Sequence, residues 1–146
     1  MGLVVNLQRK IKLDSKQFTE FSNQITGSID EAIDRDFSVA FVSDRRMKEL
    51  NSFFRGKDAT TDVLSFRHEA DEFVQMPEDV TKTYLGDIVI SVEQAQKQAG
   101  ENALTLEGEI KQLILHGLLH LCGYDHETDN GEMNKRELQL RRQLGI

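Results

Sequence analysis

Three of the chain's four histidines, His116, His120 and His126, stand close together near the C-terminus. Apolar residues recur every three or four positions across residues 106–121, which predicts an amphipathic helix. On that helix His116 and His120 lie one turn apart on the same face, and Gly123 lets the chain turn and bring His126 back. The fold must therefore bring three imidazoles to one point.

Three neutral imidazole nitrogens favour a divalent metal with a fourth position left for water or substrate. Either helical histidine alone would be interpreted as a core residue, but the three together predict metal ligands. We expect one divalent ion, with zinc first; nickel, copper and iron also accept nitrogen ligands. Cys122 is expected to point away from the ligands as a small buried residue. Asp125 either supports a ligand or stabilises a turn.

The spacing His-x3-His-x2-Gly-x2-His also occurs in metzincin proteases. Those enzymes place a glutamate directly after the first histidine as general base, and this chain has Gly117 there. Metal-bound water is a nucleophile near neutral pH, so hydrolysis of some electrophile stays in the prediction. Peptide cleavage becomes the lesser alternative.

The chain of 146 residues is the size of one domain, so we expect a single domain over residues 1–146. No apolar run approaches the roughly 18 residues of a membrane span, and no signal-like segment opens the sequence. The single cysteine fits a reducing compartment. These features predict a globular, cytoplasmic protein without a membrane partner.

The formal net charge is −7, and residues 67–110 carry ten acidic against three basic side chains. Residues 45–57 are instead basic. They contain one acidic residue, Glu49, and five basic residues, Arg45, Arg46, Lys48, Arg55 and Lys57. Such a local positive surface can meet phosphate in spite of the acidic total. Ion pairs on a solvated helix face explain Arg45, Arg46 and Lys48 equally well.

Hydrophobic periodicity predicts four strands, over residues 4–8, 37–42, 63–66 and 87–91. Two helices are predicted between the strands, one carrying apolar residues from Phe18 to Ile33 and one after Ser43 or Asp44. Three more are predicted after the last strand, over 91–100, 106–121 and 129–144. The second predicted helix carries the apolar residues Met47, Leu50, Phe53 and Phe54, and residues 67–83 are expected to form a loop. This order predicts an α+β (mixed α/β) domain with a small four-stranded mixed sheet covered by about five helices.

Three blocks of the sequence resemble the YbeY family of bacterial rRNA maturation factors, described as single-strand-specific, metal-dependent endoribonucleases. They are the block from Leu50 to Phe66, which includes Phe54-Arg55-Gly56-Lys57-Asp58, the block Leu85-Gly86-Asp87-Ile88, and the histidine block from His116 to His126. Together they fall within residues 50–126. Thr60 and Arg67 stand where the family usually has proline, a departure that concerns loop rigidity rather than chemistry.

The resemblance implies that His116, His120 and His126 hold the metal and that Arg55 is the active-site arginine that binds the RNA phosphate. A guanidinium can hold two phosphate oxygens and stabilise the charge that grows on them. Arg55 and Lys57 lie on a connection between a helix and a strand, and we expect Lys57 to contact substrate as well. An exposed arginine at a helix C-terminus is the alternative for Arg55.

The sequence therefore predicts a cytoplasmic endoribonuclease of rRNA maturation and ribosome quality control. Its expected partners are single-stranded RNA, ribosomal RNA first, and a ribosome or ribosomal-protein partner. Two alternatives stay open: a metal hydrolase of another substrate such as peptide, and a non-catalytic ribosome-associated factor whose metal is structural.

Overall fold

The computed structural model describes residues 1–68 and 83–146. These residues contain a sheet in the order β1-β2-β4-β3, built from β1 (Gly2–Asn6), β2 (Asp36–Val42), β3 (Val63–Arg67) and β4 (Tyr84–Ser91). β1, β2 and β4 are parallel, whereas β3 runs antiparallel to β4. The prediction of a single α+β domain with a four-stranded mixed sheet is confirmed.

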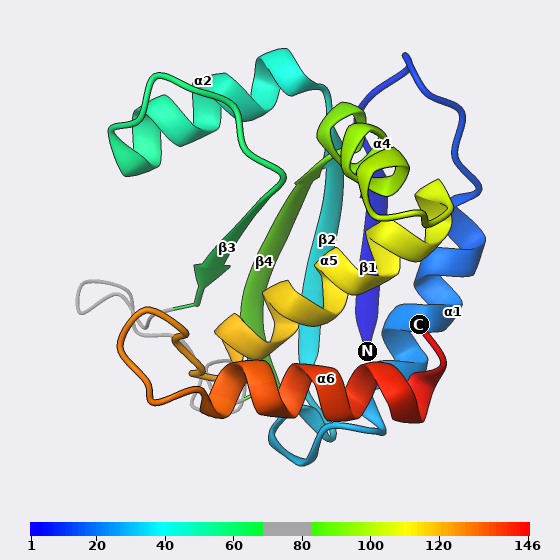
Figure 1. Ribbon diagram of the computed structural model, residues 1–146, viewed down its shortest axis with the longest axis vertical. Helices are drawn as coiled ribbons and strands as arrows, with labels where there is room; N and C mark the ends of the chain where they lie inside the picture. The colour runs from blue at the N-terminus through cyan, green and yellow to red at the C-terminus, as the bar shows by residue number, and fades with distance from the viewer. Residues whose placement is uncertain (69–82) are drawn as a thin grey trace.

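Five α-helices lie in the described ranges: α1 (Ser15–Thr26), α2 (Asp44–Arg55), α4 (Val92–Glu101), α5 (Leu106–Leu121) and α6 (Glu132–Leu144). Figure 1 shows α5 crossing the sheet, with α6 alongside it and α1 near β1. α2 lies at the opposite corner, near β3. None of the helices in residues 1–68 and 83–146 combines the length and apolarity needed to cross a membrane.

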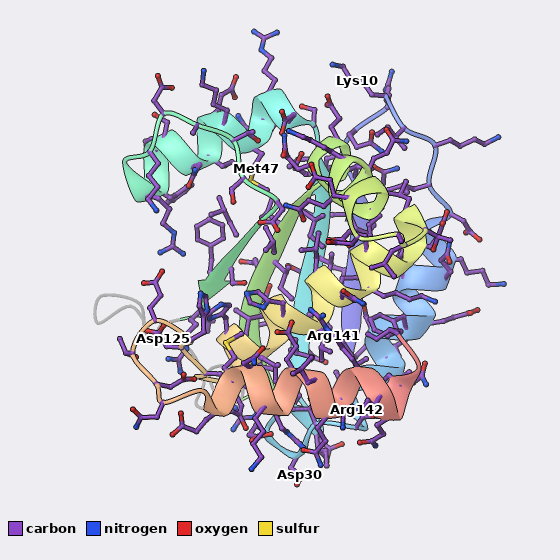
Figure 2. The ribbon with its side chains drawn as sticks, viewed as in Figure 1. Lys10, Asp30, Met47, Asp125, Arg141 and Arg142 are labelled. Atoms are coloured by element: carbon purple, nitrogen blue, oxygen red, sulfur yellow. The ribbon has the colours of Figure 1, made fainter. Side chains whose placement is uncertain are left out.

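The two faces of the sheet bury different cores because side chains alternate along a strand. Phe37, Val39 and Phe41 of β2 belong to the main core, which also takes in the apolar faces of α1 and α5. Val42 and Val89 belong to a smaller core with Met47 of α2, which points from the helix toward the sheet in Figure 2. The helix that carries two of the histidines therefore lies on the large core, opposite α2.

The predicted bounds of the first helix and of the first strand were wrong. The helix expected to reach Ile33 ends at Thr26 and is followed by a 3-10 turn, Asp30–Ala32. Ile29 still reaches the core from this turn, whereas Ile33 is 48% exposed. The N-terminal strand lies two residues earlier than predicted and ends at Asn6. Gln8 belongs to the turn that follows, where its side chain donates to Ile11 O at 2.7 Å.

The predicted second helix is present as α2, but the apolar residues that it carries differ in burial. Met47 is fully buried, but Phe53 and Phe54 are exposed to 81% and 56% at the C-terminal end of the helix. The helix continues past the edge of the small core, where Phe54 contacts the half-buried Phe66 and neither Phe53 nor Phe54 is buried.

Smaller differences concern helix ends and the long connection. α4 continues through Gly100 to Glu101. α6 begins at Glu132, three residues later than predicted, and the Asp129 carboxylate, which precedes the helix, accepts a hydrogen bond from Met133 N in its first turn at 2.9 Å. Of the loop expected over residues 67–83, Arg67 closes β3. Residues 69–82 of that prediction lie outside the described residues.

Candidate metal centre

The three histidines converge as their spacing predicts. His116 and His120 lie on α5, and His126 comes from the connection to α6. Their ring centroids are 4.8 to 5.6 Å apart, and one nitrogen of each ring lies within 4.8 Å of the other two. Three imidazoles from two consecutive segments thus face one point.

Hydrogen bonds orient the two helical rings. His116 Nδ1 lies 3.1 Å from Glu137 Oε1, and His120 Nδ1 donates to the carbonyl oxygen of Tyr124 at 2.9 Å. Both Nε2 atoms therefore face the third ring, and they are 3.2 Å apart. A partner on Nδ1 is the usual way in which a protein fixes a metal-binding imidazole.

The spacing of the two helical nitrogens, those of His116 and His120, fits a tetrahedral ion. Two nitrogens bound to Zn²⁺ at the usual 2.0–2.1 Å would be separated by about 3.3 Å, close to the observed Nε2–Nε2 distance. Burial lowers the pKa of His120, and the neighbouring His116 and His126 rings lower it further. The neutral form, which binds metal, is favoured there.

Two glycines place the helix and its end. A Cβ on Gly117 would lie 2.8 Å from Ile88 Cγ2, so the absence of a side chain lets α5 approach β4 closely. Gly123 has φ +103°, a conformation that other residues rarely adopt, and it redirects the chain toward His126. The position at which metzincins carry their glutamate is thus packed against the sheet.

Glu137 is a site residue that the sequence reasoning missed. Its i,i+4 spacing to Arg141 predicted a structural ion pair, and Arg141 Nη2 does lie 3.2 Å from Glu137 Oε1. The same carboxylate also contacts His116. Burial by itself would raise the pKa of Glu137, but the hydrogen bond and charge of His116 and the charge of Arg141 together lower it. The available signal was its position between Met133 and Leu140, on the buried stripe of an otherwise polar helix.

A cleft of about 1080 Å³ opens onto the three histidines and is also lined by Arg55 and Lys57. α2 ends at Gly56, whose φ of +67° turns the chain, and the amide of Lys57 donates to Asn51 O. The side chain of Asn51 then donates to Ala59 O at 2.8 Å, which holds the loop. The connection predicted to line a cleft therefore does so.

The Arg55 side chain is held against the wall of this cleft. Its Nη2 donates to the carbonyl oxygen of Ser65 at 2.9 Å, and its Cζ lies 5.5 Å from the centre of the Phe66 ring. These contacts join the end of α2 to β3. They position a guanidinium in the cleft that holds the histidines.

The other cations of the basic segment form surface ion pairs. Arg45 and Arg46 both lie within 4.0 Å of Glu49, and Lys48 lies 3.8 Å from Asp58. This arrangement matches the solvated helix face that the sequence offered as an alternative for these residues. It sets them apart from Arg55 and Lys57, which line the cleft.

The structure also shows the surroundings of Cys122 and Asp125, which lie next to the histidines in the sequence. Cys122 is half-buried against the main core, and burial raises the pKa of its thiol to about 11, so the thiolate that binds metals is disfavoured. Asp125, labelled in Figure 2, accepts a hydrogen bond from Glu127 N at 3.0 Å. That bond matches the turn-stabilising role rather than support of a ligand.

Fold and site together define a class: an α+β protein with three convergent histidines, on and after the helix that crosses its sheet, in a cleft shared with an arginine. Comparison with known proteins makes this specific. A family model described as Endoribonuclease YbeY matches residues 3–145, and the chain belongs to the YbeY endoribonuclease family. The predicted family and enzyme class are confirmed.

Relatives and a solved structure agree. An endoribonuclease YbeY from Nautilia profundicola is 44% identical over 137 residues, which cover 93% of this chain and 92% of the relative. Another from Alkaliphilus metalliredigens is 38% identical over 154 residues and covers 100% and 97%. The solution structure of TM1509 from Thermotoga maritima is similar with a TM-score of 0.61 and 32% identity, over 95% of this chain and 85% of that one.

Proposed function

We propose that this endoribonuclease cuts single-stranded RNA with the help of one divalent metal, and that ribosomal RNA is its substrate during rRNA maturation and ribosome quality control. The observation that carries the proposal is the shared cleft: three imidazoles with facing nitrogens and the Arg55 guanidinium open onto the same space. The relatives' name, endoribonuclease, supports the reaction class.

Within this proposal Arg55 binds the phosphodiester. Its planar fork can donate to two phosphate oxygens, and the contacts with Ser65 and Phe66 hold the side chain before RNA arrives. A preoriented cation is worth most in the transition state, when charge on the phosphoryl oxygens is greatest. Lys57 lines the same cleft. In this proposal it contacts the RNA strand beside Arg55.

His116, His120 and His126 would hold the metal, and zinc is the ion that we propose. When bound, such an ion supplies a hydroxide at neutral pH and polarises the phosphodiester. The chain's own part is to present neutral nitrogens: Glu137 and the Tyr124 carbonyl occupy the Nδ1 sides of the helical rings. A three-imidazole donor set is typical of catalytic zinc sites, and nickel or another transition metal with nitrogen ligands is the alternative that metal analysis would distinguish.

The proposal extends to place and partners. A single cysteine suits the reducing cytoplasm, where we place the activity. The acidic total charge of −7 suggests that a ribosome or ribosomal protein assists binding to RNA. A peptide hydrolase is the second candidate, and the close packing at Gly117, where a protease base would stand, counts against it.

The decisive experiment incubates the metal-loaded protein with labelled single-stranded RNA. Arg55→Ala should keep its metal and lose cleavage by about 10² to 10³, the usual loss for one oriented donor. His116→Ala should lose both the metal and the activity. Arg45→Ala is the matched control, because this exposed arginine of α2 pairs with Glu49 instead of lining the cleft.

Other outcomes separate the alternatives. Cleavage that survives Arg55→Ala, or that persists in metal-free His116→Ala, would contradict the proposal. Peptide cleavage without RNA cleavage would identify the other hydrolase. A large chelation-induced drop in melting temperature, with no RNA turnover under any metal, would identify a structural factor.

A further inference from the structure

The last turn of α2 exposes two large aromatic side chains next to the candidate site. Phe53 is 81% and Phe54 is 56% exposed, and Arg55 follows them directly. Adjacent exposed aromatic rings on a small protein usually mark a binding surface. Met47, on the first turns of the same helix, is fully buried, so the exposed large apolar side chains of α2 lie at the end near the cleft.

The rings form a row that leads into the cleft. The Phe53 and Phe54 centroids are 4.8 Å apart, and those of Phe54 and Phe66 are 5.1 Å apart, both with edge-to-face geometry. Phe66 belongs to β3, packs on the small core and lies beside the Arg55 guanidinium. Phe54 and Phe66 both line the cleft that contains the histidines. The row is therefore anchored at one end and exposed at the other.

Aromatic rings beside cations are the features by which proteins bind single-stranded nucleic acid. Here Arg55 and Lys57 line the same cleft as Phe54. An RNA strand that is bound through a phosphate at Arg55 therefore has its next base near the Phe54 ring. A base inside a duplex is stacked on its neighbours and cannot reach such a ring without unpairing. The charge of Arg55 and Lys57 favours a polyanionic strand over an apolar protein segment.

We propose that Phe53 and Phe54 are a nucleobase-stacking platform that selects unpaired RNA for this site. The proposal rests on the proposed function, since it assigns the residues that prefer single strands. Phe54 stacks the base next to the phosphate held by Arg55, and Phe53 extends the surface toward the following base. Neither ring acts in the chemical step.

The test uses the metal-loaded full chain and a short RNA that contains 2-aminopurine, whose fluorescence is quenched by stacking. Rapid mixing records binding before cleavage, with the same RNA single-stranded or annealed to its complement. Stacking on one aromatic ring contributes roughly fivefold to a hundredfold in affinity. We expect Phe54→Leu to weaken single-strand binding about tenfold, to reduce the quenching and to leave duplex binding within twofold of the wild type.

Three further variants complete the design. Phe54→Trp should keep the affinity and quenching that Phe54→Leu loses, because tryptophan retains an aromatic face. Phe53→Ser should weaken binding without disturbing the fold, because its ring is 81% exposed. Leu7→Ala is the control: Leu7 is 66% exposed on the loop after β1 and is not among the residues that line the cleft. Its RNA affinity should equal that of the wild type.

The platform is overturned if Phe53→Ser and folded Phe54→Leu bind single-stranded RNA with wild-type affinity and quenching while the wild type cuts RNA. It is also overturned if these variants keep RNA affinity but lose binding to purified ribosomal subunits, which would assign the rings to a protein contact. A wild-type protein that neither binds nor cuts RNA would overturn the proposed function instead.

Discussion

At the scale of single residues, the orientation of each helical histidine depends on the group that its Nδ1 atom contacts. His116 faces its neighbours with Nε2 because Nδ1 is occupied by Glu137, which is itself held by Arg141. In Figure 2 Arg141 lies between α6 and α5. A buried carboxylate bridging an imidazole and a guanidinium fixes the ring before a metal binds, so the ring is not reoriented on binding.

Glu137→Gln should therefore weaken metal binding by about tenfold to a hundredfold, the usual effect of losing a partner of a ligand histidine. Competition with a chelator of known affinity measures this without recourse to activity. Glu132→Gln, an exposed change on the same helix, should leave metal affinity unaltered. Wild-type affinity in Glu137→Gln, with the fold intact, would show that the carboxylate only pairs helices.

At the scale of elements, α5 reaches the sheet through a position without a side chain. Gly117 lies against Ile88 so closely that any Cβ must displace a buried, branched side chain. The histidines on either side of that contact, at positions 116 and 120, depend on it for their depth in the fold. α2 is fixed differently, through the Asp44 carboxylate at its N-terminus, which accepts hydrogen bonds from Thr60, Ser91 and Gln94.

Gly117→Ala should destabilise the protein by about 1 to 3 kcal/mol, the usual range for overpacking a core. Denaturant unfolding at fixed metal concentration measures the change. Gly100→Ala is the matched control, because that helical glycine has no neighbouring atom within 4 Å of an added Cβ. It should be neutral or stabilising by up to about 1 kcal/mol. Adding Ile88→Ala should remove much of the Gly117→Ala penalty, and strictly additive effects would exclude the proposed contact.

Asp44 predicts a dependence of stability on pH. Burial alone would raise its pKa, but hydrogen bonds from Thr60, Gln94 and Ser91 outweigh burial, so its pKa is lowered from 3.8 in the fold. The unfolded state then binds the proton more tightly, so this contribution is present above pH 3.8 and is lost as the pH falls through the folded pKa. In metal-free protein, the stability advantage over Asp44→Asn should shrink in that window. A constant difference down to the acid limit would contradict this.

Sequence periodicity predicted the elements better than their exposed ends. The strands and helices were found because their buried faces repeat at two or at three and four residues. Periodicity alone could not show that α2 extends beyond its core, so it gave no sign that Phe53 and Phe54 are exposed. It also extended α1 to Ile33, because Ile29 keeps the spacing although it reaches the core from a 3-10 turn. That error assumes that a helix continues as long as its apolar pattern does.

At the scale of the whole molecule, the site draws on segments far apart in sequence. The histidines come from α5 and the loop that follows, Arg55 from the end of α2, and Phe66 from β3. The histidine spacing could be interpreted locally, because one helix and one turn bring the rings together. The contact of Glu137 with His116 could not, because it depends on how α6 packs against α5.

Metal binding should also stabilise the whole fold, because the ion would tie α5 to the loop before α6. At a free metal concentration of about 100 times the dissociation constant, the gain is about 2.7 kcal/mol, or roughly 5 to 10 °C in melting temperature. Differential scanning calorimetry with and without chelator measures the shift. His126→Ala should abolish most of the difference between the two conditions. An equal shift in that variant would place the ion elsewhere.

In the proposed site, three histidines hold one metal and leave one coordination position open. X-ray absorption on the zinc-loaded protein examines this coordination shell. We expect one ion per chain, with three imidazole nitrogens at about 2.0 Å and one further light atom from water. A sulfur neighbour at about 2.3 Å, which would assign Cys122 as a fourth ligand, or fewer than three imidazoles would contradict it.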